Sequence, residues 1–494
     1  MPYDYIKEIE KSPVYDVASV TPIQNIHSIS NSSLNTILLK REDLQPVHSF
    51  KLRGAYHKIS SLPRSILNQG IIASSAGNHA QGVAFSAHKL NCSATIVMPL
   101  TTPLIKVDAV RSYGAQVILN GDTYDDAYTF AIKQAKMKNL QFIHPYDDEQ
   151  VISGQGTIGK ELLQQVPNID YLFVPVGGGG LIAGISTYIK FKSPTTKIIS
   201  VEPENSACFY HAIKNNERVI LDNIGIFADG VAVKQLGKIP FDICKTTVDD
   251  SICVTTDEIC SSIKNIYDDI RAIAEPAGAL SLAGIKKYIS KNNISQKTCV
   301  GLLCGGNMNF HRLRHISERT QHAESKEAIF SVKIPEKKGS FHTFCELIGK
   351  RSITEFNYRY SDEKYAFIFV GVEVSGYEER KFLMSLIQTH YSISDLTDNE
   401  MAKLHIRHMV GGKASLPVEK IFRIQFPERP GALLEFLDRL GKHWNISLFH
   451  YRNHGAAFGR ILVGFSITKD SESRLLQHIT SIGYRFFDET NNPC

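Results

Sequence analysis

The sequence is poor in the features that mark secreted, metal-binding and nucleic-acid-binding proteins. Its nine cysteines include no C-x-x-C pair and no cluster at metal-ligand spacing, so we expect reduced thiols in a cytoplasmic protein. The formal net charge is only +5 over 494 residues, and the basic residues are dispersed, which argues against nucleic-acid binding. Hydrophobic residues make up 43% and charged residues 21% of the chain, as in ordinary globular proteins.

Long hydrophobic runs are also scarce. The N-terminus carries Asp4 where a signal peptide needs a basic region, and no apolar stretch follows. One uncharged run, residues 171–189, contains 19 residues, which is long enough to cross a membrane. Pro175 and four glycines interrupt this run and disfavour a continuous helix. We therefore expect a buried strand, a glycine turn and a buried helix, and no membrane span.

The length predicts two or three domains, because 494 residues exceed what one hydrophobic core accommodates. Up to about residue 320, short apolar strands alternate with helical patterns, which indicates an α/β domain with parallel strands. The expected strands are 36–39, 71–73, 94–97, 116–119, 142–144, 171–176, 197–201 and 300–304, and the expected helices are 52–60, 78–89, 103–113, 123–137 and 181–190. Ligands of such sheets bind beyond the carboxyl ends of the strands.

Lys51 lies between Phe50 and Leu52, with Arg53 close by. Burial among apolar groups, or a second cation nearby, favours the neutral amine. A neutral lysine amine is a nucleophile that can form a Schiff base with a carbonyl. Taken alone, Lys51 is more readily explained as an exposed lysine at the start of an amphipathic helix.

Three strand ends carry unusual residues. Residues 74–79 (SSAGNH) predict a nest of backbone N–H groups that can hold a carboxylate, although Asn78 is equally suited to be an ordinary helix N-cap. The glycines 177–180 predict a phosphate site at a helix N-terminus. A dinucleotide fingerprint is the less favoured alternative there, because it falls in the middle of the domain. Cys304 ends a third strand and is either an inert buried thiol or part of the same cleft.

After about residue 320 the alternation stops and one pattern occurs twice. Residues 334–341 (IPEKKGSF) match residues 426–433 (FPERPGAL), and later segments of the two copies also match. Each copy predicts a β-α-β-β-α-β unit, and the polar stretch 400–420 is expected to join them. Neither copy contains a catalytic constellation, which favours a regulatory or assembly role.

Three motifs jointly resemble the serine/threonine dehydratases: residues 49–55 (SFKLRGA), residues 75–82 (SAGNHAQG) and residues 177–181. These are pyridoxal-phosphate enzymes of the tryptophan-synthase-β-like fold (PLP fold type II). The repeated units resemble the paired ACT-like domains of the long, biosynthetic threonine dehydratases. The resemblance implies an α/β catalytic domain over residues 1–322 and two ACT-like α+β regulatory domains over residues 328–400 and 420–494.

The resemblance also implies roles for single residues. Lys51 matches the lysine that forms the Schiff base with pyridoxal 5'-phosphate, and Asn78 matches the residue that bonds the ring hydroxyl. The implied phosphate cradle consists of Gly177, Gly178, Gly179, Gly180 and Leu181, and the implied substrate-carboxylate site of Ser75, Gly77 and His79. Tyr358 matches a tyrosine of the isoleucine site, and Tyr451 is its counterpart in the second copy.

The chain departs from the family pattern at several positions. Cys304 stands where a serine commonly faces the pyridine nitrogen, and a thiol is a weaker but still uncharged partner. Ala76 replaces the hydroxyl that serine racemases use, which disfavours racemisation. The carboxylate that completes a metal site after Glu202 is missing, and His311 with His315 lacks a third ligand, so we expect no metal.

The implied reaction is deamination of L-threonine to 2-oxobutanoate and ammonia, the first step of isoleucine biosynthesis. The resemblance further implies inhibition by isoleucine, an opposing effect of valine, and a homotetramer. A serine-preferring dehydratase, or another β-eliminating enzyme of the fold, is the alternative reading. A sensor protein with a vestigial catalytic half is a third possibility, and the intact Lys51, Asn78 and glycine loop speak against it.

Overall fold

The structure is a computed structural model that divides into two compact units, residues 1–313 and residues 314–494, and each unit is described by itself. The described residues are 3–310, 312–323, 326–335, 340–349, 351, 353–360, 364–399, 401–402, 419–427, 436, 439–440, 444–452 and 458–492. His311 and most of the predicted linker 400–420 lie outside them.

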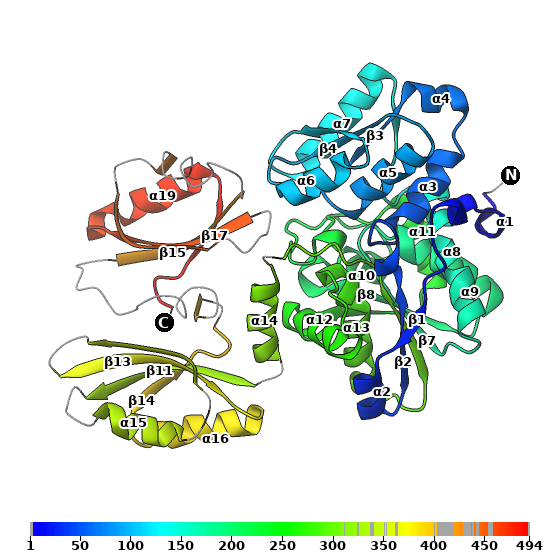
Figure 1. The fold of residues 1–494 in the computed structure, drawn as a ribbon. Helices are drawn as coiled ribbons and strands as arrows, with labels where there is room; N and C mark the ends of the chain where they lie inside the picture. The colour runs from blue at the N-terminus through cyan, green and yellow to red at the C-terminus, as the bar shows by residue number, and fades with distance from the viewer. Residues whose placement is uncertain are drawn as a thin grey trace. The chain divides into compact units, whose positions relative to one another are not determined.

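The first unit contains two sheets (Figure 1). The larger sheet has the strand order β1-β2-β10-β7-β8-β9, and its neighbours are parallel except for β1 and β2. Its strands are β1 (Ile23–Asn25), β2 (Thr36–Arg41), β7 (Tyr171–Pro175), β8 (Lys197–Pro203), β9 (Asp250–Val254) and β10 (Thr298–Leu303). Because β10 lies between β2 and β7, the carboxyl ends of these three strands meet at one edge.

The smaller sheet has the order β5-β4-β3-β6 and is parallel throughout. It consists of β3 (Ile71–Ser74), β4 (Ala94–Met98), β5 (Gln116–Leu119) and β6 (Gln141–Phe142). Helix α5 (Asn78–Lys89) follows β3 and buries small apolar residues such as Ala80 and Val83 in one core with Ile71 and Ala73. Parallel strands covered by helices in this way explain the apolar runs of the sequence.

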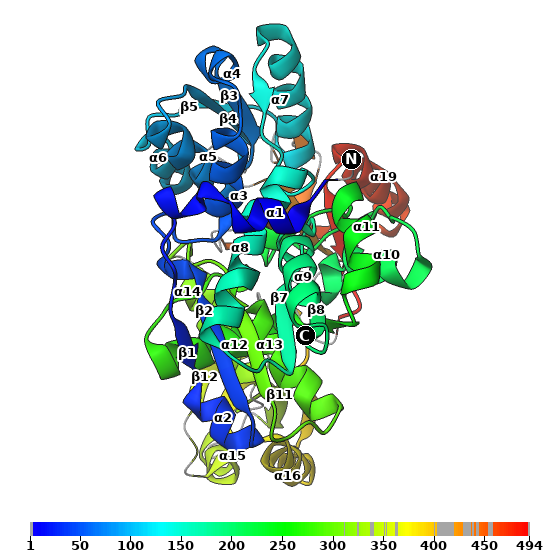
Figure 2. The same cartoon turned by 90° about the vertical axis from the view of Figure 1, so that its right-hand side faces the viewer.

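Helices connect the two sheets. Helix α3 (Lys51–Ser60) packs against α5 and against α8 (Glu149–Gln165), and α8 packs against α9 (Gly180–Lys192). Helix α13 (Pro276–Lys291) packs on β7, β8 and β10 of the larger sheet (Figure 2). The other helices are α1 (Tyr5–Glu10), α2 (His27–Ser33), α4 (Arg64–Gln69), α6 (Leu104–Arg111), α7 (Tyr124–Lys138), α10 (Cys208–Asn215), α11 (Lys238–Thr247), α12 (Thr256–Ile270) and α14 (Arg312–Ala323).

The second unit contains two sheets of the same topology. Their orders are β12-β13-β11-β14 and β16-β17-β15-β18. The first module comprises β11 (Glu327–Pro335), α15 (Ser340–Ile348), β12 (Ile353–Tyr360), β13 (Tyr365–Glu373), α16 (Tyr377–Gln388) and β14 (Ser392–Asp395). The second comprises β15 (Glu419–Pro427), β16 (Asn445–Arg452), β17 (Phe458–Ser466), α19 (Glu472–Ile482) and β18 (Arg485–Asp488), and most residues between β15 and β16 lie outside the described part.

The repeat extends to details of the backbone. Each module has a register shift early in its second strand, at residues 353–355 and 446–448. The hydroxyl inside each shift donates to the first residue of the module: Thr354 to Glu327, and Ser447 to Glu419. Equivalent bulges bonded to equivalent glutamates show that the two modules share one structural plan, as the sequence repeat predicts.

The predicted strands and helices of the first unit are confirmed, with ends that differ by at most two residues. Residues 171–189 form β7, a glycine turn and most of α9, and no helix within the described residues is long and apolar enough to cross a membrane. The alternative role of Asn78, as the N-cap of the helix, is wrong. Asn78 does not cap α5 with its side chain, because the cap position is Gly77 and the amide is engaged elsewhere.

Candidate active site

Lys51 is the first residue of α3 and is only partly exposed. Its Nζ donates to the carbonyl of Pro145 at 3.1 Å and lies 5.3 Å from the centre of the Phe50 ring. Burial lowers the pKa of Lys51 to about 8. Among the described residues, the amine donates to a carbonyl and lies near an aromatic ring, and because burial lowers its pKa, the neutral, nucleophilic form is accessible near neutral pH.

The segment after β3 places polar groups at the start of α5. The hydroxyl of Ser75 accepts from the backbone N–H of Gly77 at 3.2 Å, and this bond closes the turn. The first N–H groups of a helix have no partner within the helix, so the start of α5 can receive an anion such as a carboxylate. This geometry suits the predicted role of Ser75 and Gly77.

His79 is buried, and its Nε2 lies 3.0 Å from the carbonyl oxygen of Ile143. Burial lowers the pKa of His79 to about 3, so the ring is neutral at physiological pH and its Nε2 carries the hydrogen that it donates. Because the carbonyl occupies this nitrogen, the backbone N–H of His79 is the group best suited to the predicted anion site.

The glycine loop follows β7 and leads into α9. Gly179 has φ +90°, a conformation that favours glycine. A Cβ at Gly178 would lie 2.2 Å from the Tyr146 ring, and a Cβ at Gly180 would lie 2.9 Å from the Tyr146 Cα. Only glycines let this loop approach the segment after β6, and the N-terminus of α9 then offers N–H groups to a phosphate.

Cys304 follows β10 and is 3% exposed. Its Sγ lies 3.4 Å from the carbonyl oxygen of Ala277, to which the thiol donates. Burial raises the pKa of Cys304 well above its usual value, so the thiol is uncharged. The backbone N–H of Phe50 donates to the carbonyl of Cys304 at 3.2 Å, and this bond ties the residue before Lys51 to the end of β10.

The residues that these elements bring together fit pyridoxal phosphate. Lys51 supplies an amine of lowered pKa, the glycine loop supplies a tight cradle at a helix N-terminus, and Cys304 supplies a neutral wall. These groups match an aldehyde, a phosphate and an aromatic ring, respectively. Tyr358 and Tyr451 occupy equivalent places in the modules of the other unit, opposite Ile368 and Ile461, and their side chains lie outside the described part of the structure.

Three residues of this site belong to none of the motifs that the sequence displays. Tyr146 packs on the glycine loop, Asn307 donates to Asn78 at 2.7 Å, and Asn78 donates to Glu275 at 2.6 Å. Glu275 directly precedes Pro276, the first residue of the largely apolar α13. A lone carboxylate before a buried helix is a signal that could have identified it.

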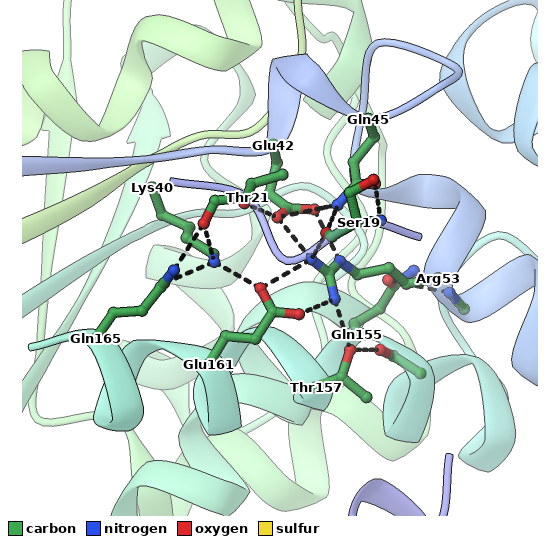
Figure 3. A network of polar contacts seen from close by, with 12 residues as sticks. Ser19, Thr21, Lys40, Glu42, Gln45, Arg53, Gln155, Thr157, Glu161 and Gln165 are labelled. Carbon is green, nitrogen blue, oxygen red and sulfur yellow. Dashed lines mark hydrogen bonds and ion pairs between the residues drawn. The ribbon is translucent and has the colours of Figure 1, made fainter. Parts of the chain in front are cut away.

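A buried ion network lies behind the first turn of α3 (Figure 3). Arg53 donates to both oxygens of Glu42, at 2.8 Å each, and to Glu161 Oε1 at 2.5 Å. Lys40 donates to Glu161 Oε2 at 2.5 Å and to Gln165 at 2.8 Å. The side chains of all four charged residues are fully buried.

The network contains two cations and two carboxylates, so its formal charges balance. Although burial disfavours its charge, the carboxylates of Glu42 and Glu161 raise the pKa of Arg53. Glu42 comes from the segment after β2, and Glu161 comes from α8. The network therefore fixes the first turn of α3, and with it Lys51, against two neighbouring elements.

Comparisons with known proteins agree with this geometry. A family model described as pyridoxal-phosphate dependent enzyme matches residues 14–305, and one described as the C-terminal regulatory domain of threonine dehydratase matches residues 318–406 and 410–494. The L-threonine dehydratase biosynthetic IlvA of Pasteurella multocida is 50% identical over 494 residues, which cover 99% of this chain and 96% of the relative. The mitochondrial threonine dehydratase of Saccharomyces cerevisiae is 44% identical, and the match covers 99% of this chain and 88% of that relative.

A solved structure is also similar to a large part of the chain. The processed form of threonine deaminase isoform 2 from Solanum lycopersicum is 45% identical with a TM-score of 0.63, and the match covers 64% of this chain and 92% of that chain. The fold class and the pyridoxal-phosphate cofactor predicted from the sequence are thereby confirmed.

Proposed function

Since the chain belongs to the pyridoxal-phosphate-dependent enzymes and carries the C-terminal regulatory domain of threonine dehydratases, we propose that it deaminates L-threonine to 2-oxobutanoate and ammonia. Threonine dehydratases 44–50% identical over nearly the whole chain support this activity. The observation that carries the proposal is the Lys51 amine of lowered pKa, which donates to the carbonyl of Pro145, the residue before the Tyr146 that packs on the glycine loop. This activity would constitute the first step of isoleucine biosynthesis.

When bound, pyridoxal phosphate delocalises the electrons of the broken Cα–H bond. The protein has to bind threonine, accept the Cα proton and exclude competing reactions. Lys51 Nζ, with a pKa of about 8, is suited to accept that proton. The N–H groups at the start of α5, with the hydroxyl of Ser75, are suited to bind the threonine carboxylate.

The remaining proposed contacts hold the cofactor. Residues 177–181 would bind its phosphate, and the amide of Asn78 would bond its ring hydroxyl. The uncharged thiol of Cys304 would face the ring nitrogen without protonating it. The proposed boundaries place this catalytic domain within residues 1–322 and the regulatory domains within residues 328–400 and 420–494.

Substitution of Lys51 by alanine tests the catalytic assignment. The variant should lose turnover by on the order of 10³-fold, because a positioned acid–base group contributes about 10²–10⁴-fold. Release of 2-oxobutanoate by the purified protein measures this loss. Lys58→Ala is a matched control on the same helix, where Lys58 pairs with Asp148 at 2.8 Å, and it should remain active. Near-normal activity of Lys51→Ala would exclude the assignment.

We further propose that isoleucine binds the regulatory modules and inhibits the enzyme, and that valine opposes isoleucine. The duplicated module and its family match support a ligand-sensing role. Coupling between such sites typically changes affinity by about 5–150-fold. Tyr358→Leu should keep its activity and lose inhibition by isoleucine, whereas Tyr377→Leu, at an exposed position on α16, should remain inhibited. Unchanged inhibition of Tyr358→Leu would exclude that residue.

The proposal also covers the assembly state and the location of the protein. We expect a homotetramer, which sedimentation of the purified protein would test. We also expect a cytoplasmic location, and the seven cysteines whose side chains the structure describes are all free thiols, as suits a reducing compartment.

A further inference from the structure

Glu275 lies in the candidate site, and none of the proposed steps uses its carboxylate. Asn78 Nδ2 donates to Glu275 Oε1 at 2.6 Å, and Asn307 Nδ2 donates to Asn78 Oδ1 at 2.7 Å. Asn307 is held in turn by the carbonyl of Val47 at 2.9 Å. Both ends of the Asn78 amide are therefore fixed, one by the residue before α13 and the other by the segment after β10.

The surroundings of Glu275 are shaped to receive its side chain. Glu275 is 4% exposed, and a Cβ at Gly305 would lie 2.3 Å from Oε1. A Cβ at Gly230 would lie 3.5 Å from the same atom. The carboxylate does not cap α13, although Glu275 occupies the N-cap position. The carboxylate points to Asn78 instead, and Gly305 and Gly230 leave room for the Glu275 side chain in this orientation.

Charged groups from several elements surround this carboxylate. Burial raises the pKa of Glu275 to about 7, and Asp229 acts in the same direction. The hydrogen bond from Asn78 opposes this rise, as do Lys106 and Arg312, which form ion pairs with Asp229 at 2.8 and 3.5 Å. Lys51 on α3 and Cys304 after β10 also interact electrostatically with Glu275.

We propose that Glu275 is a positioning residue, whose ionised carboxylate holds the Asn78 amide in the orientation that presents an N–H to the ring hydroxyl of the cofactor. The inference rests on the proposed function and adds a residue to it. A carboxylate only accepts hydrogen bonds, so it dictates that Nδ2 of Asn78 faces it and leaves the second N–H of that nitrogen for the cofactor. A protonated Glu275 accepts more weakly and carries a donor of its own, so the orientation is no longer dictated.

Two pH effects follow, with opposite signs. Activity should fall as the pH drops through about 7, because Glu275 becomes protonated. Stability should change in the other direction. The pKa is raised on folding, so the contribution of Glu275 to stability is fully present below its usual value of 4.5 and is lost as the pH rises through about 7. A neutral glutamine at this position should therefore raise the unfolding temperature at about pH 8.

The test compares the wild-type holoenzyme with Glu275→Gln and Glu275→Asp from about pH 6 to about pH 9. Three quantities are measured at each pH: 2-oxobutanoate release, the visible absorbance of the bound cofactor and the unfolding temperature. Glu275→Gln should lower kcat about tenfold, equivalent to one hydrogen bond to a charged group, with KM for threonine little changed. In both the rate and the absorbance, the part of the decline at acid pH that comes from Glu275 should disappear, while the part that comes from Lys51 remains. Glu275→Asp should have a reduced rate and should still lose activity as the pH falls.

The matched control is Glu202→Gln. Glu202 is another buried carboxylate with a raised pKa, and it accepts from the backbone N–H groups of Phe209 and Tyr210, at 2.8 and 2.7 Å. This control should show the same decline of activity at acid pH as the wild type.

A Glu275→Gln enzyme with the wild-type rate and the wild-type decline at acid pH overturns the proposal and leaves the proposed function standing. If the wild-type enzyme releases no 2-oxobutanoate, the function fails, and the absorbance and unfolding measurements still decide the role of Glu275. If Glu275→Gln does not fold, wild-type kcat in Glu275→Asp overturns the proposal.

Discussion

Glu161→Gln is the most direct test of the ion network behind α3. The substitution keeps the size of the side chain and removes one negative charge. Arg53 and Lys40, whose nitrogens each lie 2.5 Å from a Glu161 oxygen, are then left with Glu42 as their one carboxylate. One buried positive charge becomes uncompensated. Removing one partner of a buried pair costs about 3–5 kcal/mol, so we expect the free energy of unfolding to fall by about that amount.

The pH dependence of the loss makes the prediction sharper. Burial lowers the pKa of Lys40 even while Glu161 opposes it, so Lys40 is the cation that can release its proton most easily. Without Glu161 its folded-state pKa should fall further below the value in the unfolded chain. A depressed lysine pKa destabilises the fold increasingly as the pH falls. The deficit of the variant should therefore shrink as the pH rises.

Urea unfolding, monitored by the visible absorbance of the bound cofactor, measures the stability of residues 1–313, the unit that contains the ion network. The single tryptophan, Trp444, lies in the other unit, so its fluorescence does not report the network directly. Asp108→Asn is the control, because Asp108 and Arg111 form an exposed pair at 3.6 Å, and its loss should change stability by less than about 0.5 kcal/mol.

A double variant provides a second test of the ion network. Replacing both members of one pair, with Lys40→Met and Glu161→Leu together, keeps the charges balanced, so the double variant should recover most of the lost stability. A Glu161→Gln protein within about 1 kcal/mol of the wild type would show that the network is not an isolated set of balanced charges.

Two further predictions concern the cofactor site. Gly178→Ala should weaken pyridoxal-phosphate binding by about 5–150-fold, because a Cβ 2.2 Å from the Tyr146 ring corresponds to about 1–3 kcal/mol of overpacking; an absorbance titration with unchanged affinity would contradict the assignment of the loop. Cys304→Ser should deaminate threonine within about threefold of the wild-type rate, because a hydroxyl is also uncharged and can donate to the carbonyl of Ala277; a much larger loss would mean that the thiol itself is needed.

The sequence by itself determined the order of the elements and the family. Apolar runs between turn residues predicted the strands, because parallel strands buried on both faces have to be apolar throughout. Four glycines in one loop predicted a backbone that can wrap closely round a phosphate, and the structure adds that the loop packs against Tyr146. The duplicated pattern predicted two modules of equal topology, and the structure shows both. These features depend on neighbours in the chain, so they are legible in the sequence.

Only the tertiary structure decided which distant side chains meet. Asn78 reads in the sequence as a helix cap, yet its amide is held by Glu275 and Asn307, which are 197 and 229 residues away. Arg53 reads as a neighbour of Lys51, yet it is anchored to Glu161, 108 residues further on. These contacts follow from the insertion of β10 between β2 and β7 and from the packing of α8 on α3. A local pattern carries no information about such long-range pairing, which depends on the register of the sheet and the packing of its crossover helices.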